Sequence, residues 1–110
     1  MSEFLFLYRN GDKLSPEQMQ QQMGRWMAWM KELEGKGVLK SMGHPLERSG
    51  KLVSGAKRVV TDGLFAEAKD VIGGYSIVEA KDLDSAVDLT AGCPIFGVGG
   101  GVEVRPLMKM

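Results

Sequence analysis

The chain has 110 residues, 44% of them hydrophobic and 25% charged, which suits one compact domain and is too short for two independent cores. Fourteen basic residues balance fourteen acidic ones and no Lys/Arg run forms a basic stripe, so we expect no nucleic-acid binding. The single cysteine, Cys93, excludes an internal disulfide and is typical of a reducing compartment.

Residues 3–9 are apolar at nearly every position and β-prone, which predicts a strand that is covered on both faces. This apolar run lacks a basic leader and ends at Arg9, so we expect no signal peptide. No segment approaches the roughly 20 apolar residues of a membrane span. We therefore expect a single cytoplasmic domain over residues 1–110 with no membrane contact.

Ser15-Pro16-Glu17-Gln18 predicts the start of a helix, because Ser15 and Gln18 can cap each other and proline suits the first turn. An apolar stripe follows at helical spacing, and Gly35 and Gly37 are expected to end the helix. The stripe consists of Met19, Met23, Trp26, Met27, Met30 and Leu33. We interpret its methionines as core filler.

The central part of the chain predicts short strands. Residues 38–42 form one candidate strand, and residues 47–57 are expected to form a hairpin around Ser49-Gly50. Residues 58–61 are a strand leading into an Asp62-Gly63 turn, and residues 75–80 are a further strand.

The C-terminal part predicts a second helix and a last strand. Asp82 is the expected N-cap, and Gly92 and Pro94 end the helix. A glycine-rich link then leads to a strand over residues 102–105. The expected apolar face of this helix consists of Leu83, Ala86, Val87 and Thr90.

This order of elements predicts an α+β domain with a split βαβ arrangement, in which two helices cover one face of an antiparallel sheet. Phe4, Phe6 and Tyr8 alternate with Leu5 and Leu7, so one apolar row faces away from the helices. An uncovered apolar face in so small a domain usually marks an interaction surface. We expect a homodimer with the sheets facing each other and a cleft near the sheet edge.

Residues 62–69, Asp-Gly-Leu-Phe-Ala-Glu-Ala-Lys, are followed by Gly73-Gly74-Tyr75 and resemble the Asp-Gly-Pro-Phe (DGPF) signature of the YCII-related family. Cys93-Pro94 and the later Val102-Glu103-Val104-Arg105-Pro106 support this resemblance, as do the Gly37-Val38-Leu39 start of the second strand and the Trp-bearing first helix. It covers nearly the whole chain and implies a ferredoxin-like domain that dimerises like the dimeric α/β barrels.

The activity of this family is mostly undefined. The resemblance implies, for some members, a lyase or isomerase that uses a His–Asp pair in the dimer cleft. For the Asp-Gly-Pro-Phe type it implies a sigma factor as partner. This chain departs from the pattern twice: Leu64 replaces the signature proline, and the first helix has Trp26 where the dyad members have histidine.

His44 is the single histidine and lies at a predicted strand end before Pro45, so it is the candidate acid or base. A solvated turn histidine is the simpler interpretation. Asp62 is the second catalytic candidate, although Asp before Gly also holds a turn by bonding its own backbone. Cys93 is a further candidate nucleophile, and no cluster of residues has the spacing of a metal site.

The ligand-binding candidates are charged and aromatic. Glu67 and Lys69 would point the same way in an extended segment and present opposite charges to a polar ligand; a solvated pair is the alternative. Arg105 could hold an anion or form a salt bridge with Glu103 at the rim. Aromatic walls are expected from Tyr8, Phe65 and Tyr75, whereas Trp26 is expected in the core.

Two classes of function stay open. The first is a binding module that holds a small polar or aromatic metabolite in a dimer-associated cleft, or that meets a protein partner such as a sigma factor. The second is a cofactor-free lyase or isomerase in which His44 or Asp62 moves a proton. Because the expected helix histidine is missing, the sequence favours binding.

Overall fold

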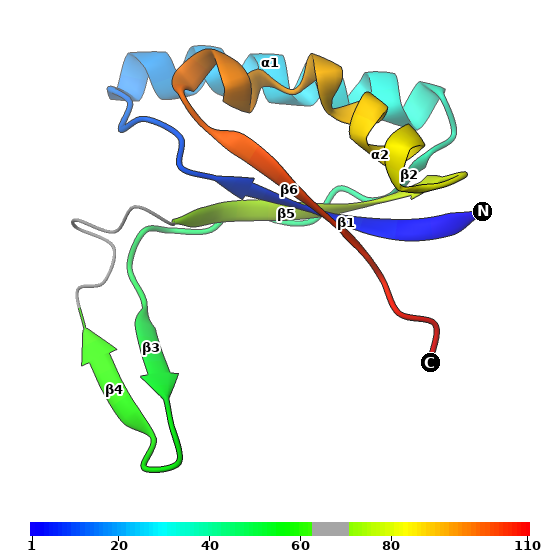
Figure 1. Ribbon diagram of the computed structural model, residues 1–110. Coiled ribbons are helices and arrows are strands. Elements are labelled where there is room, and N and C mark those ends of the chain that lie inside the picture. The colour runs from blue at the N-terminus through cyan, green and yellow to red at the C-terminus, as the bar shows by residue number, and fades with distance from the viewer. Residues whose placement is uncertain (63–70) are drawn as a thin grey trace.

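The computed structural model describes residues 1–62 and 71–110. Four antiparallel strands form one sheet in the order β2-β5-β1-β6. They are β1 (Ser2–Arg9), β2 (Leu39–Ser41), β5 (Ile72–Ala80) and β6 (Gly101–Pro106). The helices α1 (Pro16–Gly35) and α2 (Leu83–Leu89) lie on the same side of this sheet (Figure 1). The α+β class with an antiparallel sheet and two helices is thus confirmed.

The ends of α1 follow from local chemistry. The Ser15 hydroxyl accepts a hydrogen bond from the Gln18 amide at 3.1 Å, and the Ser15 amide donates to the Gln18 side chain at 2.9 Å. This reciprocal pair satisfies two amides that a helix start leaves without a partner. At the other end Gly37 adopts a φ of +73°, which ends the helix as expected.

The core lies between the sheet and α1. Phe4, Phe6 and Tyr8 of β1 are buried toward the helices, and the Phe6 ring stacks on Trp29 with 6.3 Å between centroids. Leu5 and Leu7 alternate with these residues, so they point to the opposite face of the sheet, where they are half-buried. One row of the first strand therefore faces away from both helices.

The buried face of α1 differs from the expected stripe. Trp29, Met30 and Leu33 are buried and Gln22 joins them, whereas Met19, Met23 and Met27 are exposed. The expectation that these three methionines fill the core is therefore wrong. Residues four apart advance by 400°, so a row with this spacing turns away from the sheet along the helix.

The second helix also packs along a narrower row than expected. Asp82 caps it by accepting from the Ser85 amide at 2.8 Å, as expected. Ala86 and Thr90 are buried, but Leu83 and Val87 are exposed, so the expected four-residue face is wrong by half. Two 3-10 turns (Thr90–Gly92 and Pro94–Val98) then lead to β6.

A hairpin stands apart from the main sheet. The strands β3 (Lys51–Ser54) and β4 (Val59–Asp62) pair with each other and form a second, two-stranded sheet. It projects from the side of the main sheet opposite the helices (Figure 1). The expected turn at Ser49-Gly50 is wrong: the turn is formed by residues 55–58, where Gly55 and Arg58 supply positive φ angles. The β-prone Leu52-Val53 pair joins a strand instead of a loop.

Within the described ranges, no helix is both long and apolar enough to cross a membrane.

Candidate functional site

A cavity of about 480 Å³ lies beside the core. It is bounded by α1 between Met19 and Met30, the loop over residues 10–14, the segment over residues 42–48 and the start of β5. Ligand pockets in proteins typically measure about 300–1,000 Å³, so this cavity has the size for a small molecule.

The helix contributes an apolar wall of thioethers and an indole. Met19, Met23 and Met27 line the cavity from α1, and Met42 lines it from the segment after β2. The half-buried Trp26 stands between the core and the cavity, with its ring 4.5 Å from that of Tyr8 in an edge-on contact. The three exposed methionines of α1 and Met42 are therefore gathered on one concave surface.

Tyr8 is held at the inner end of the cavity by a chain of hydrogen bonds. Its hydroxyl donates to the Ser76 hydroxyl at 2.8 Å, and Ser76 donates in turn to the Met42 carbonyl at 2.7 Å. Burial raises the pKa of the Tyr8 phenol well above its usual value. The phenol therefore stays protonated at neutral pH and contributes a fixed, neutral aromatic wall.

The segment that carries His44 is bonded to the start of β5. The Tyr75 amide donates to the His44 carbonyl at 3.3 Å, and the Leu46 amide donates to the Gly73 carbonyl at 2.8 Å. Gly43 has a φ of +70°, and a Cβ at this position would lie 1.8 Å from the Tyr75 carbonyl oxygen. This close approach of the Gly43 backbone to β5 requires glycine. It places the exposed His44 ring 6.1 Å from the Tyr75 ring, measured between ring centroids.

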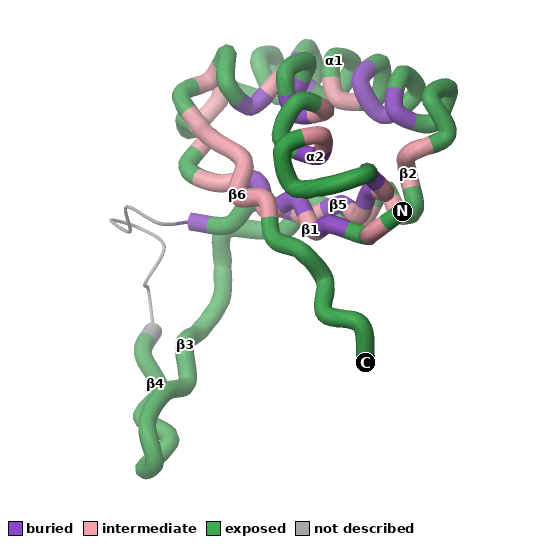
Figure 2. Tube along the Cα trace, turned by 45° about the vertical axis from the view of Figure 1, so that its right-hand side comes forward, coloured by how far each residue is buried: buried purple, intermediate pink, exposed green. Residues whose placement is uncertain are grey.

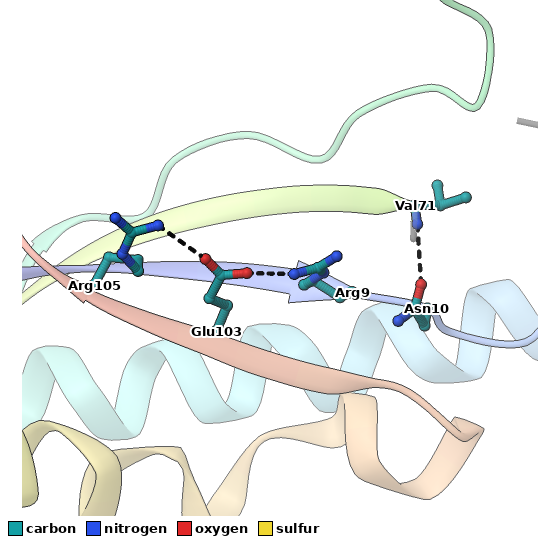
Figure 3. A network of polar contacts seen from close by, with 5 residues as sticks. All are labelled: Arg9, Asn10, Val71, Glu103 and Arg105. Atoms are coloured by element: carbon teal, nitrogen blue, oxygen red, sulfur yellow. Dashed lines mark hydrogen bonds and ion pairs between the residues drawn. The ribbon is translucent and has the colours of Figure 1, made fainter. Parts of the chain in front are cut away.

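Polar groups close the end of the cavity next to β1. Asn10, in the left-handed conformation, brackets Val71: its amide donates to the Val71 carbonyl at 2.9 Å and its side chain accepts from the Val71 amide at 2.9 Å (Figure 3). Arg48 donates to the Gly11 carbonyl at 3.0 Å. These bonds tie the 10–14 loop to the two segments across the cavity.

Three of the residues proposed from the sequence meet here. Tyr8, His44 and Tyr75 all line the cavity. Arg105 lies elsewhere, on β6, where it forms an ion pair at 3.1 Å with Glu103, which also pairs with Arg9 (Figure 3). Arg105 and Arg9 together hold the pKa of the Glu103 carboxyl below its usual value.

Most of the Asp-Gly-Leu-Phe-Ala-Glu-Ala-Lys segment over residues 62–69 is not described by the structure. Phe65, Glu67 and Lys69 lie outside the described residues. Asp62 is the last residue of β4 and pairs with Lys51 in the hairpin register. The role of these four residues stays a prediction.

Several cavity residues had no place in the sequence-based site. Met23 and Met27 were assigned to the core, Trp26 was expected there too, and Arg48 was not singled out. The four-residue spacing of the methionines was a usable signal, because such a row rotates away from a buried face.

Cys93 belongs to the core. Burial raises the pKa of its thiol to about 11 and the residue is 5% exposed, so the thiol is protonated at neutral pH. This environment argues against Cys93 as the nucleophile of a Cys–His pair.

Comparison with known families matches residues 1–110 to the YCII-related domain. The chain belongs to the YCII-related family. No curated protein matches this YCII-related chain. Among solved structures, it is similar to 5-chloro-2-hydroxyhydroquinone dehydrochlorinase (TftG) from Burkholderia phenoliruptrix AC1100, in complex with 2,5-dihydroxybenzoquinone. The identity is 24%, the TM-score is 0.49, and the match covers 96% of this chain and 95% of that one.

Proposed function

We propose that this YCII-related protein binds a small aromatic molecule in the cavity between α1 and the start of β5. The observation that carries the proposal is the cavity of about 480 Å³ with methionine and tryptophan side chains along its helical wall. Apolar pockets with a few placed polar groups are the usual form of small-molecule sites.

The ligand class follows from the side chains. Thioether sulfurs pack favourably against aromatic rings, and flexible methionines adapt to different ring substituents. Trp26 and Tyr8 add aromatic surface at the inner end. The polar heads of Tyr8 and Gln22 are already bonded within the protein, to Ser76 and to the Pro94 carbonyl, so they leave apolar surface for a ligand.

A polar substituent on the ligand would be placed by the other wall. His44 and Arg48 line the cavity there, and both are exposed. A phenol or carboxylate on the ring could accept a hydrogen bond from either side chain. We therefore propose phenols and aromatic carboxylates as the ligand class.

One observation favours a second candidate function. His44, the single histidine of the chain, lines the cavity, so the side chain best suited to proton transfer at neutral pH borders the proposed ligand site. The alternative is a lyase or isomerase in which His44 moves a proton of the bound ring or its substituent. Asp62 is kept as a second acid/base candidate on the sequence motif alone.

We also propose the finer placement of the chain within its family. The strand order β2-β5-β1-β6 supports a ferredoxin-like arrangement, and residues 62–65 support the Asp-Gly-Pro-Phe type. A cytoplasmic location and a sigma factor as partner stay predictions from the sequence.

Tryptophan fluorescence tests the binding proposal. Trp26 borders the cavity, so titration with phenols and benzoates should change its emission with a saturable dependence on concentration. A Met23→Glu variant places a charge in the apolar wall and should weaken binding at least about tenfold, because burying an unpaired carboxylate is costly. Met23 is 65% exposed in the free protein, so its free energy of unfolding should change by no more than about 0.5 kcal/mol.

The matched control is Met108→Glu. Met108 is also exposed but is not a lining residue of the cavity, so this variant should bind like the wild type. Equal loss of affinity in both variants, or no saturable change with any aromatic ligand, would contradict the proposal. Should a ligand be turned over, His44→Gln separates the two functions: lost turnover with retained binding supports proton transfer, and unchanged turnover excludes His44 as the acid or base.

A further inference from the structure

The β3–β4 hairpin carries apolar side chains on both of its faces. Val53 lies opposite Val60 in the antiparallel register, and these two side chains share one face. Leu52 and Val59 lie on the other face. All four are about half exposed, and Figure 2 shows the described hairpin as exposed along its whole length.

Such a hairpin is not expected to be stable alone. A two-stranded sheet in water is marginal unless a further strand or another packed surface covers it. The hairpin here is separated from the main sheet, and it projects on the side away from the helices (Figure 1). It therefore needs a partner surface that residues 1–62 and 71–110, the part of the chain that the structure describes, do not supply.

The size of the molecule also indicates that part of its surface is covered by a partner. Its accessible surface is 7940 Å², whereas a compact monomer of this mass exposes about 6,000 Å². The radius of gyration is 15.3 Å, against about 13 Å for a compact chain of this length. The excess of about 1,900 Å² exceeds the roughly 800 Å² that each partner buries in a standard interface.

The open face of the main sheet offers a matching surface on the same side of the molecule. Leu5 and Leu7 of β1 and Ile77 of β5 form its apolar middle; Leu5 lies directly opposite Ile77 in the register. Charged pairs border this middle, with Lys40 bonded to Glu79 at 3.1 Å and Arg105 bonded to Glu103. Because these charges are paired, a partner can cover these two pairs without burying an isolated charge.

We propose that the β3–β4 hairpin is an arm that packs across the open sheet face of a second copy of this chain. Both surfaces occur on one chain and on one side of it, so a two-fold axis brings each hairpin onto the sheet of the other copy. The exposed hairpin and the open sheet face of each copy are thereby covered in one symmetric contact. This arrangement goes beyond a contact between the two sheets alone, because the hairpin forms part of the interface.

Sedimentation velocity of charged hairpin variants tests the arm. The wild type should sediment as a dimer at micromolar concentration. Aspartate at Val53 and Val60 charges one hairpin face, and aspartate at Leu52 and Val59 charges the other. At least one of these double variants should raise the dimer dissociation constant about a hundredfold or more, because charges at a buried contact oppose association. Leu7→Asp on the open face should do the same.

Val87→Asp is the matched control. Val87 on α2 is 48% exposed, close to the 50% of Val53, but it lies on the helical side of the molecule, so this variant should remain dimeric. A monomeric wild type, or a dimer that survives charges on both hairpin faces, would overturn the proposal. Circular dichroism checks that each variant is folded.

Hydrogen exchange of the wild type provides a test without substitutions. The amides of residues 51–60 should exchange more slowly as protein concentration rises and dimer forms. If these amides exchange at the same rate in monomer and dimer, the interface does not include the hairpin and the proposal fails.

Discussion

The main sheet and the β3–β4 hairpin are built from similar residues and have opposite surroundings. The strands β1 and β5 alternate between buried and more exposed positions, whereas every residue of β3 is exposed. Both contain β-branched and other apolar side chains, which favour extended backbone in either setting. The comparison shows that local preference selects the strand, and that the packed layer of helices determines which strand contributes to the core.

The largest expected effect comes from truncating one leucine in each region. Leu33 on α1 is 1% exposed, so Leu33→Ala leaves a cavity and should lower the free energy of unfolding by about 4 kcal/mol. Leu52 in the hairpin is 48% exposed, and Leu52→Ala should cost about 0.5 kcal/mol in the monomer. Urea denaturation at low protein concentration measures both.

Similar losses of unfolding free energy in the two leucine variants would contradict the contrast between sheet and hairpin, because they would show that the hairpin is packed within its own chain. A large loss of stability for Leu52→Ala that appears only at high protein concentration would instead indicate that the hairpin is packed in the dimer, since dimer formation adds to stability by mass action.

Substitution of two glycines with left-handed backbone distinguishes the cost of a steric overlap from the cost of the backbone conformation alone. Gly37 has a φ of +73° and, apart from its chain neighbours, no atom within 4 Å of an added Cβ, so Gly37→Ala should cost about 1 kcal/mol. Gly43 has nearly the same φ, but its Cβ would overlap the Tyr75 carbonyl. Gly43→Ala should therefore cost about 2–3 kcal/mol and weaken ligand binding as well. Equal costs in thermal or urea unfolding would show that the segment moves away from β5 without penalty.

The last expected effect is a loss of stability at alkaline pH. Burial raises the pKa of the Cys93 thiol from 9.0 to about 11, so the folded state retains a proton that the unfolded chain releases. The stabilisation is complete below pH 9 and is lost as the pH rises toward 11. The midpoint temperature of thermal unfolding should therefore fall less steeply with pH over this range for Cys93→Ala than for the wild type. Parallel curves would exclude Cys93 as a source of the alkaline slope.

Features set by neighbouring residues were predictable from the sequence. The start of α1 at Ser15-Pro16 and the cap at Asp82 were confirmed, because capping depends on residues only three positions apart. The alternation of Phe4, Phe6 and Tyr8 with the two leucines was also visible, since it needs only the strand period. The antiparallel α+β class followed from these elements.

Features set by distant residues were not predictable in the same way. Periodicity places Met19, Met23 and Met27 near the apolar side of α1, but whether they meet a sheet or a cavity depends on the segment over residues 42–48. The hairpin turn was placed at Ser49-Gly50 because that pair has turn chemistry, yet strand pairing moved the turn to residues 55–58. Tyr8, His44 and Tyr75 were proposed as site residues and line one cavity, whereas Arg105 lies apart from it.

The methionine wall of the cavity has a chemical consequence. Thioethers react with peroxides to give sulfoxides, which are polar and chiral, and Met23 and Met27 are accessible for this reaction. Oxidation would turn the surface proposed to bind aromatic rings into a polar one that retains water. Preparations of this protein that have aged in air should then lose affinity for the proposed aromatic ligands, and methionine sulfoxide reductases should restore that affinity.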